Sequence, residues 1–191
     1  MNYQDVKLPS GYEMIAAESK SLGFSMCSDL QTGSLLRTLV SSKPGGRFLE
    51  IGTGTGLSLA FIVDGMDKNA MVTSIDNAEE FQEVAKNYFR QDEQVDFFTG
   101  DGNDWIKEHR EEKFDLIFAD SWPGKYMLLD ETLAMLKPGG FYVIDDMNEQ
   151  PNWPEGHDIK ASALAESLKA NAAYNTTVLN WSTGLIIVTA R

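Results

Sequence analysis

A glycine-rich turn, Gly52-Thr53-Gly54-Thr55-Gly56, follows the short apolar segment 48–51 and precedes the helical pattern 57–66. Glycine has no Cβ, so such a turn can adopt positive φ angles and bring bare backbone close to a ligand at the N-terminal end of a helix. A purely structural turn would rarely need three glycines, because each costs conformational entropy. The segment therefore predicts a nucleotide-type binding site between a strand and a helix.

The spacing of the glycines separates two kinds of nucleotide ligand. The dinucleotide fingerprint G-x-G-x-x-G would place a glycine at position 57, where this chain has Leu57. Glu50 stands ahead of the glycines, where its carboxylate would repel a pyrophosphate and favour a cationic ligand. The pattern E-x-G-x-G-x-G resembles the first motif of class I S-adenosylmethionine-dependent methyltransferases, whose ligand carries a sulfonium and an ammonium group. The cofactor-binding residues that this resemblance implies are Glu50, Gly52, Thr53, Gly54 and Gly56.

Composition and charge narrow the possible partners. The 191 residues, 42% of them hydrophobic, suit one domain over residues 1–191 with one core. The net charge of −13 repels phosphate backbones and anionic membranes, and the single cysteine, Cys27, excludes an internal disulfide. The N-terminus lacks the basic and apolar regions of a leader, and no run approaches the roughly 18 apolar residues of a membrane span. We expect a cytoplasmic monomer or homodimer that acts on a small molecule, without nucleic acid or membrane as a partner.

Strand and helix patterns alternate along most of the chain, which indicates βαβ units and a parallel sheet. The predicted strands are 48–51, 71–75, 95–98, 114–119 and 141–145, and the predicted helices are 56–66, 78–91, 103–112, 126–136 and 158–170. Two helical segments come first, so residues 1–46 are expected to cover the sheet edge or the cofactor mouth. Segments 174–181 and 185–190 are strand-like, and the connection between them is too short for a crossover helix. The pattern predicts an α/β fold whose seven-stranded, mostly parallel sheet ends in an antiparallel hairpin.

Acidic residues stand at the carboxyl ends of the predicted strands, where an open α/β sheet binds its ligands. Asp76 lies 20 residues beyond Gly56, the distance at which a carboxylate can accept hydrogen bonds from ribose hydroxyls. The residues at the later strand ends are Asp101 and Gly102, then Asp120, then Asp145 and Asp146. Each aspartate alone would also suit a helix N-cap, but their shared topological position favours a binding site.

Several later motifs resemble the catechol and caffeoyl-CoA O-methyltransferase group, and the resemblance extends over residues 24–191. The segments that carry it are Phe114–Trp122, Lys125-Tyr126, Leu136–Gly140 and Val143–Asp146. It implies the Rossmann-like strand order 3-2-1-4-5-7-6. It also implies that Asp76 binds the cofactor ribose, that Asp101 and Gly102 lie along the adenine, and that Trp122 stacks on it. Asp120 is a further candidate cofactor-binding residue. Segment 150–157 is similar to one in uncharacterised bacterial class I methyltransferases.

The resemblance also implies a metal site. In the resembled group, an Asp after the fourth strand and an Asp-Asn pair after the fifth hold a divalent cation, which corresponds to Asp120, Asp145 and Asp146 here. Three carboxylates suit a hard ion such as Mg²⁺ or Ca²⁺. Asp146 replaces the group's Asn, so a metal-free role as caps or hydrogen-bond acceptors is the alternative. With a hydroxyl acceptor, the expected consequence of the metal is activity that depends on a divalent ion.

The catalytic base is a second departure from the group. In the animal catechol enzymes a Lys lies three residues after the strand-four Asp, and this chain has Pro123 there. His157 follows a Trp- and Pro-rich loop, 148–157, which we expect to present Trp153 and His157 at the acceptor mouth; the alternative is a surface or helix-capping histidine. The candidate catalytic residues are Asp120, Lys125 and His157.

The sequence thus favours methyl transfer from S-adenosylmethionine to a small acceptor, at oxygen, by in-line displacement. A methyltransferase acting on nitrogen or on a protein side chain is the nearest alternative. A non-catalytic S-adenosylmethionine-binding module is another, because the group's Lys is missing. An NAD(P)-dependent oxidoreductase is disfavoured by Leu57 and by the terminal hairpin.

Overall fold

A seven-stranded sheet forms the centre of the computed structural model, which describes residues 6–150, 153–180 and 182–191. The strands are β1 (Arg47–Ile51), β2 (Met71–Asp76), β3 (Val95–Thr99), β4 (Phe114–Ala119), β5 (Leu136–Ile144), β6 (Tyr174–Leu179) and β7 (Leu185–Ala190). Their order is β3-β2-β1-β4-β5-β7-β6, with β1 to β5 parallel and β7 antiparallel to both of its neighbours. The predicted fold class, strand order and C-terminal hairpin are confirmed.

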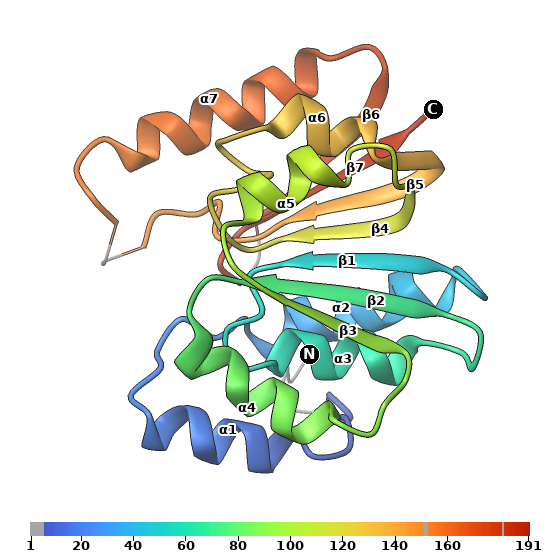
Figure 1. Ribbon diagram of the computed structural model, residues 1–191. Helices are drawn as coiled ribbons and strands as arrows, with labels where there is room; N and C mark the ends of the chain where they lie inside the picture. The colour runs from blue at the N-terminus through green and yellow to red at the C-terminus, as the bar shows by residue number, and fades with distance from the viewer. Residues whose placement is uncertain (1–5, 151–152, 181) are drawn as a thin grey trace.

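Helices cover both faces of the sheet (Figure 1). They are α1 (Tyr12–Ser21), α2 (Leu30–Ser41), α3 (Leu57–Gly65), α4 (Glu79–Phe89), α5 (Gly102–Glu108), α6 (Leu129–Ala134) and α7 (His157–Ala170). The helices α1 to α4 share one apolar core with the sheet, and α5 to α7 share the other. Among the described residues, no helix has both the length and the apolar character needed to cross a bilayer.

Local sequence explains where the helices next to the binding edge begin. Asp29 caps α2 by accepting hydrogen bonds from the backbone N–H groups of the first turn. The helix α4 has no side-chain cap of its own at Ala78. Asp76, at the end of β2, instead accepts from the Ala78 N–H at 2.8 Å. Asp76, the last residue of β2, therefore fixes the start of α4 and, as described below, the glycine turn.

Three predicted boundaries were wrong by three residues or more: the end of α5 and the starts of α6 and β5. The helix α5 ends at Glu108 rather than at 112. The strand β5 begins at Leu136 rather than at 141, because a bulge absorbs the Lys137–Gly140 turn: the pair Phe114–Leu136 is followed directly by Leu116–Phe141. The helix α6 begins at Leu129 rather than at 126, since Leu128 has a left-handed backbone (φ 56°) that ends the preceding turn. Residues 1–5, Pro151, Asn152 and Trp181, on which some expectations above depend, lie outside the described residues.

Candidate active site

A cavity of about 490 Å³ opens at the carboxyl ends of β1, β2, β4 and β5. Its volume is typical of a small-molecule site. The strand-end residues in its wall are Gly52–Thr55, Asp76–Ala78, Asp120–Trp122, Lys125, Tyr126, Asp145 and Asp146. The other wall residues are Phe24–Ser28, Leu57, Ser58, Phe81, Gln150, Trp153, Pro154, His157 and Thr183. One cavity therefore brings together the glycine turn, the acidic strand ends and the tryptophan loop.

The glycine turn lies tightly against the neighbouring strand ends. The N–H groups of Gly52 and Thr53 both donate to the Ile75 carbonyl, at 2.8 and 3.1 Å. Gly52 has a φ of 112°, and a Cβ there would lie 2.8 Å from the Asp120 carbonyl oxygen, so only glycine fits. Gly56 does not line the cavity, because it packs against Ala85 of α4. The first two glycines thus shape the site, and the third lets two helices approach.

Asp76 holds the turn in place from the end of β2. One carboxylate oxygen accepts from the Gly54 N–H at 2.7 Å, and the other accepts from the Ala78 N–H at 2.8 Å. The side chain also lines the cavity. A carboxylate has about four acceptor positions, so it can receive ligand hydroxyls as well as these two backbone groups.

Glu50 is fully buried beneath the turn and is not in the cavity wall. Its carboxyl accepts hydrogen bonds from Ser58 Oγ, at 2.7 Å, and from Ser74 Oγ. Burial raises the pKa of Glu50 to about 8, although both serine hydrogen bonds act against the rise. Glu50 is therefore not placed to contact a cofactor in the cavity, although the resemblance implied such a contact. It supports the glycine turn from beneath, through its hydrogen bonds with Ser58 and Ser74.

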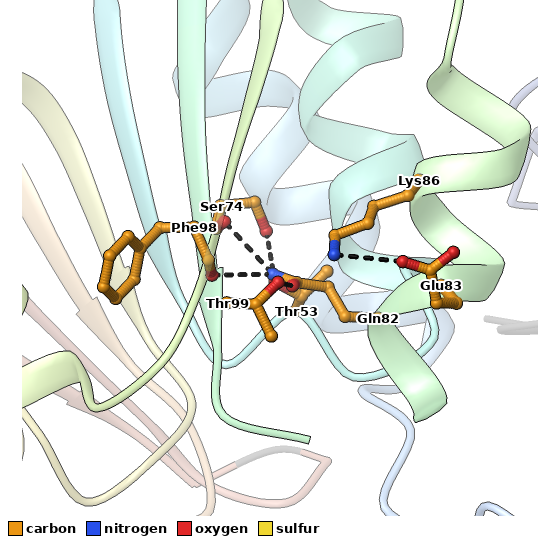
Figure 2. A network of polar contacts seen from close by, with 7 residues as sticks. All are labelled: Thr53, Ser74, Gln82, Glu83, Lys86, Phe98 and Thr99. Atoms are coloured by element: carbon orange, nitrogen blue, oxygen red, sulfur yellow. Dashed lines mark hydrogen bonds and ion pairs between the residues drawn. The ribbon is translucent and has the colours of Figure 1, made fainter. Parts of the chain in front are cut away.

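A buried glutamine completes the support of the turn (Figure 2). The two N–H groups of Gln82 Nε2, on α4, are shared among three acceptors: Thr53 Oγ1 at 3.1 Å, the Phe98 carbonyl at 3.0 Å and the Ser74 carbonyl at 3.3 Å. Its Oε1 accepts from Thr99 Oγ1. The glycine turn, β2, β3 and α4 are thus joined through one side chain. Sequence reasoning missed Gln82, although a polar residue on the apolar face of α4 was the available signal.

Three carboxylates converge at the other end of the cavity. Asp120 Oδ2 accepts from Ser28 Oγ at 2.9 Å, and Asp145 Oδ1 accepts from the Asp146 N–H at 2.8 Å and from Thr183 Oγ1. Asp146 has a φ of 54°, a left-handed conformation that Asp and Asn tolerate best. Burial, and then the charge of Asp145, raises the pKa of Asp120 well above its ordinary value. Burial also raises the pKa of Asp145 to about 6.

Lys125 lies among these carboxylates with only 5% of its surface exposed. Its Nζ donates to the backbone carbonyls of Asp145, at 2.6 Å, and Asp146, at 3.3 Å. Burial lowers the pKa of Lys125, while the charges of Asp146, Asp120 and Asp145 act to raise it. This end of the cavity therefore combines anionic side chains with one buried amine.

Aromatic rings surround His157 at the first residue of α7. The ring centroid of His157 lies 4.5 Å from Trp153, 5.1 Å from Tyr126 and 5.7 Å from Trp122. Its Nε2 lies 3.2 Å from the Tyr126 hydroxyl, and its Nδ1 is buried without a hydrogen-bond partner in the described part of the chain. Burial lowers the pKa of the imidazole, and the charges of Lys125 and Lys160 lower it further. His157 is a buried residue of the cavity wall rather than a surface histidine.

Comparison with protein families decides the relationship. A family model described as a methyltransferase domain matches residues 49–147, more than half of the chain. The chain belongs to this methyltransferase family. A protein of Mycobacterium sp. (strain JLS), provisionally named an O-methyltransferase, is 28% identical over 144 residues, which cover 72% of this chain and 66% of that protein. A similarly named protein of Mycolicibacterium vanbaalenii is 28% identical over 117 residues, with 59% and 52% covered. The chain thus spans about half to two thirds of the length of these relatives.

Solved structures show the same fold over nearly the whole chain. The O-methyltransferase from Bacillus cereus, in complex with S-adenosylhomocysteine, has a TM-score of 0.85 at 18% identity, with 98% of this chain and 93% of that chain covered. The O-methyltransferase TomG from Streptomyces achromogenes, in complex with S-adenosylmethionine, has a TM-score of 0.83 at 19% identity, with 97% and 92% covered. The class I methyltransferase fold of this family member is therefore established.

The adenine assignments differ from what the family resemblance implied. Asp101 is exposed and caps α5, where it accepts from the Asn103 N–H at 2.7 Å, and it does not line the cavity. Gly102 is buried against Pro123. Trp122 does line the cavity, with 46% of its surface exposed. Of the three residues proposed for the adenine, the geometry offers only Trp122 to a ligand.

The metal site that the resemblance implied does not fit the residues as they are arranged. Among residues 6–150, 153–180 and 182–191, no group of three or more His, Cys, Asp or Glu side chains is placed to hold a metal ion. Oxygen atoms of Asp120 and Asp145 instead accept hydrogen bonds from Ser28 and Thr183, and the amine of Lys125 donates to the backbone carbonyls of Asp145 and Asp146.

Proposed function

We propose that this chain transfers the methyl group of S-adenosylmethionine to a hydroxyl group of a small acceptor. The observation that carries the proposal is that one cavity joins the glycine turn and Asp76 at one end to a group of buried and partly buried acidic residues at the other. A donor and an acceptor can therefore lie side by side, as an in-line displacement requires. Membership of the methyltransferase family and the fold shared with S-adenosyl-bound O-methyltransferases support the choice of donor and of oxygen.

At the donor end, the turn and Asp76 have complementary tasks. Gly52, Thr53 and Gly54 expose backbone to the cavity, and Asp76 offers the acceptor positions that two ribose hydroxyls need. Glu50 and Gln82 act from below by fixing the turn. When bound, S-adenosylmethionine supplies a methyl group attached to a sulfonium. The acceptor oxygen takes this methyl group, and S-adenosylhomocysteine is the leaving group.

At the acceptor end, the chain must remove the hydroxyl proton. Asp120 is the base that we propose, because it lines the cavity, and because burial raises its pKa, which makes its carboxylate a stronger base than an ordinary aspartate. Ser28, hydrogen-bonded to the other side of this carboxyl group, fixes its orientation. The proton moves to Asp120 as the acceptor oxygen forms its bond to the methyl carbon.

The aromatic side chains around His157 form the remaining acceptor wall. Trp122 and Trp153 line the cavity beside the imidazole, and Tyr126 orients the imidazole through its hydroxyl. The unpartnered Nδ1 of His157 can pair with a polar group of the acceptor. We therefore assign His157 to acceptor binding and Asp120 to proton removal.

Calorimetry with S-adenosylhomocysteine tests the donor half of the proposal. Replacement of Asp76 by Ala removes two charge-assisted hydrogen bonds to ribose, each worth roughly 1.5–3 kcal/mol, so affinity should fall by about tenfold or more. Asp101→Ala is the matched control, because Asp101 lies outside the cavity, and its affinity should equal that of the wild type. Incubation with S-adenosylmethionine and a panel of hydroxylated acceptors, followed by mass spectrometry, tests the transfer. Binding of NAD(H) without any response to S-adenosylhomocysteine would refute the proposal.

A further inference from the structure

The turn that carries Lys125 is built by the residues that depart from the resembled group. The Lys125 N–H donates to the Trp122 carbonyl at 3.2 Å, with Pro123 second in the turn and Gly124, at φ 77°, third. Proline second and a left-handed glycine third are the requirements of a type II turn. The proline that replaces the group's lysine therefore helps to place another lysine two positions later.

The core of the protein fixes this turn. The Gly124 carbonyl accepts a hydrogen bond from the hydroxyl of Tyr142, a fully buried residue of β5. A Cβ at Gly124 would lie 2.9 Å from both Ile51 Cδ1 and Tyr142 Oη, so only glycine fits at this position of the turn. The hydrogen bond from Tyr142 ties the residue before Lys125 to the sheet, and the Lys125 side chain lines the cavity.

The end of the Lys125 side chain is also held. Its Nζ donates to the carbonyl oxygens of Asp145 and Asp146, which are the two residues after β5. An ammonium group has three N–H donors, so one is left for a ligand once these two bonds are made. These two hydrogen bonds hold the amine in the cavity wall that also contains the side chains of Asp120, Asp145 and Asp146.

The ammonium lies among the side chains that the resemblance assigned to a divalent ion. Asp120, Asp145, Asp146 and Lys125 all line the same cavity. A divalent cation bound to these carboxylates would lie close to the fixed like charge of Lys125, in a partly buried site where charges are weakly screened. The carboxylates already have a counter-charge within the chain.

We propose that the ammonium of Lys125 is a built-in cation that takes the role of the divalent ion, so that methyl transfer proceeds without a metal. The inference rests on the proposed function. The Nζ–H group of Lys125 donates to the acceptor oxygen and offsets the negative charge that grows on it. The acceptor proton passes to the Asp120 carboxylate, the oxygen–methyl bond forms, and the sulfur–methyl bond breaks to give a neutral thioether. Lys125 keeps its proton throughout.

Titration with Mn²⁺, followed by the paramagnetic resonance signal of the free ion, tests the inference in the presence of S-adenosylhomocysteine. The wild type and the charge-conserving variant Lys125→Arg should leave the signal unchanged up to about 1 mM, the range of weak protein sites. Lys125→Met removes the internal charge and should bind one Mn²⁺ per chain about tenfold or more tighter than the wild type. Lys125→Gln is a second neutral variant, and thermal unfolding shows that each variant is folded.

Two outcomes would overturn the inference. One is a single Mn²⁺ bound by the wild type and lost in Asp145→Asn, which would show that the carboxylates hold a metal beside Lys125. The other is folded neutral variants that gain no Mn²⁺, which would show that Lys125 does not compensate these carboxylates. Calorimetry with S-adenosylhomocysteine on the same samples tests the proposed function separately. The Mn²⁺ titration does not depend on that calorimetric result, so a failure of the proposed function can be told apart from a failure of this inference.

Discussion

Replacement of Glu50 by Gln should change how the stability of the protein depends on pH. Glu50 is fully buried, and its pKa is about 8 in the folded chain, against an ordinary value of 4.5. The folded state therefore binds a proton that the unfolded chain has already released between these two values. Because protons are then bound more tightly by the folded state, the free energy of unfolding falls as pH rises from about 4.5 through about 8.

The size of the effect follows from the same two pKa values. One pKa unit corresponds to about 1.4 kcal/mol, so the interval from 4.5 to about 8 corresponds to about 5 kcal/mol lost by the wild type across this range. Gln has nearly the shape of the protonated acid and can still pair with Ser58 and Ser74. We expect Glu50→Gln to match the wild type within about 1 kcal/mol at pH 5 and to exceed it by several kcal/mol at pH 8, up to the limit of about 5.

Urea-induced unfolding, followed by circular dichroism at pH 5, 6, 7 and 8 without ligand, measures both slopes. Glu93→Gln, at an exposed position, is the control and should keep the wild-type slope. If the free energy of unfolding changed with pH in the same way for the wild type and for Glu50→Gln, the reasoning would be refuted. Such a result would mean that ionisation of Glu50 does not destabilise the folded protein.

Two further predictions concern the two ends of the cavity. Gln82→Leu removes the hydrogen bonds that the Gln82 amide makes with Thr53 and with the Ser74 and Phe98 carbonyls, so the free energy of unfolding should fall by about 2 kcal/mol or more, and the affinity for S-adenosylhomocysteine should fall with it. The control is Glu83→Gln, because the Glu83 carboxylate pairs with Lys86 on the surface (Figure 2); this variant should change neither quantity in unfolding and calorimetry experiments. Asp120→Asn removes the proposed base and should lower kcat by about a hundredfold or more. In the wild type, kcat/KM should rise with pH as Asp120 loses its proton, and a pH-independent rate or an active Asn variant would contradict that role.

The sheet was predictable because its signals are local. The connection before Leu185 is too short for a crossover helix, which forces β6 and β7 to be antiparallel. The start of β5 was not predictable in the same way. Lys137-Pro138-Gly139-Gly140 has the composition of a free turn, and only its pairing with β4 turns it into a bulge within a strand. A bulge depends on how the segment pairs with its partner strand, and the sequence of segment 137–140 does not determine that pairing.

A site residue could be predicted from the sequence where its position along a strand is sufficient, but not where its role depends on contacts with distant residues. Asp76 is the last residue of a strand, and this position alone indicated that it lines the cavity. The position of Glu50 gave the same indication, but Ser58 and Ser74, which lie 8 and 24 residues away along the chain, bind its carboxyl group beneath the turn. Lys125 likewise depends on a turn geometry and on two carbonyls that come from 20 and 21 residues further on. Such pairings require the folded chain.

The walls of the cavity are formed by two kinds of structural element, strand–helix junctions and loops. The donor end is made at strand–helix junctions, so its residues cannot move without changing the pairing of β1 and β2. The described residues of the loop before α7 line the other end, and this loop belongs to no strand. Exchange of this short loop for that of another family member would leave every strand pair intact. We expect such a chimera to keep its affinity for the methyl donor while its choice of acceptor follows the transplanted loop.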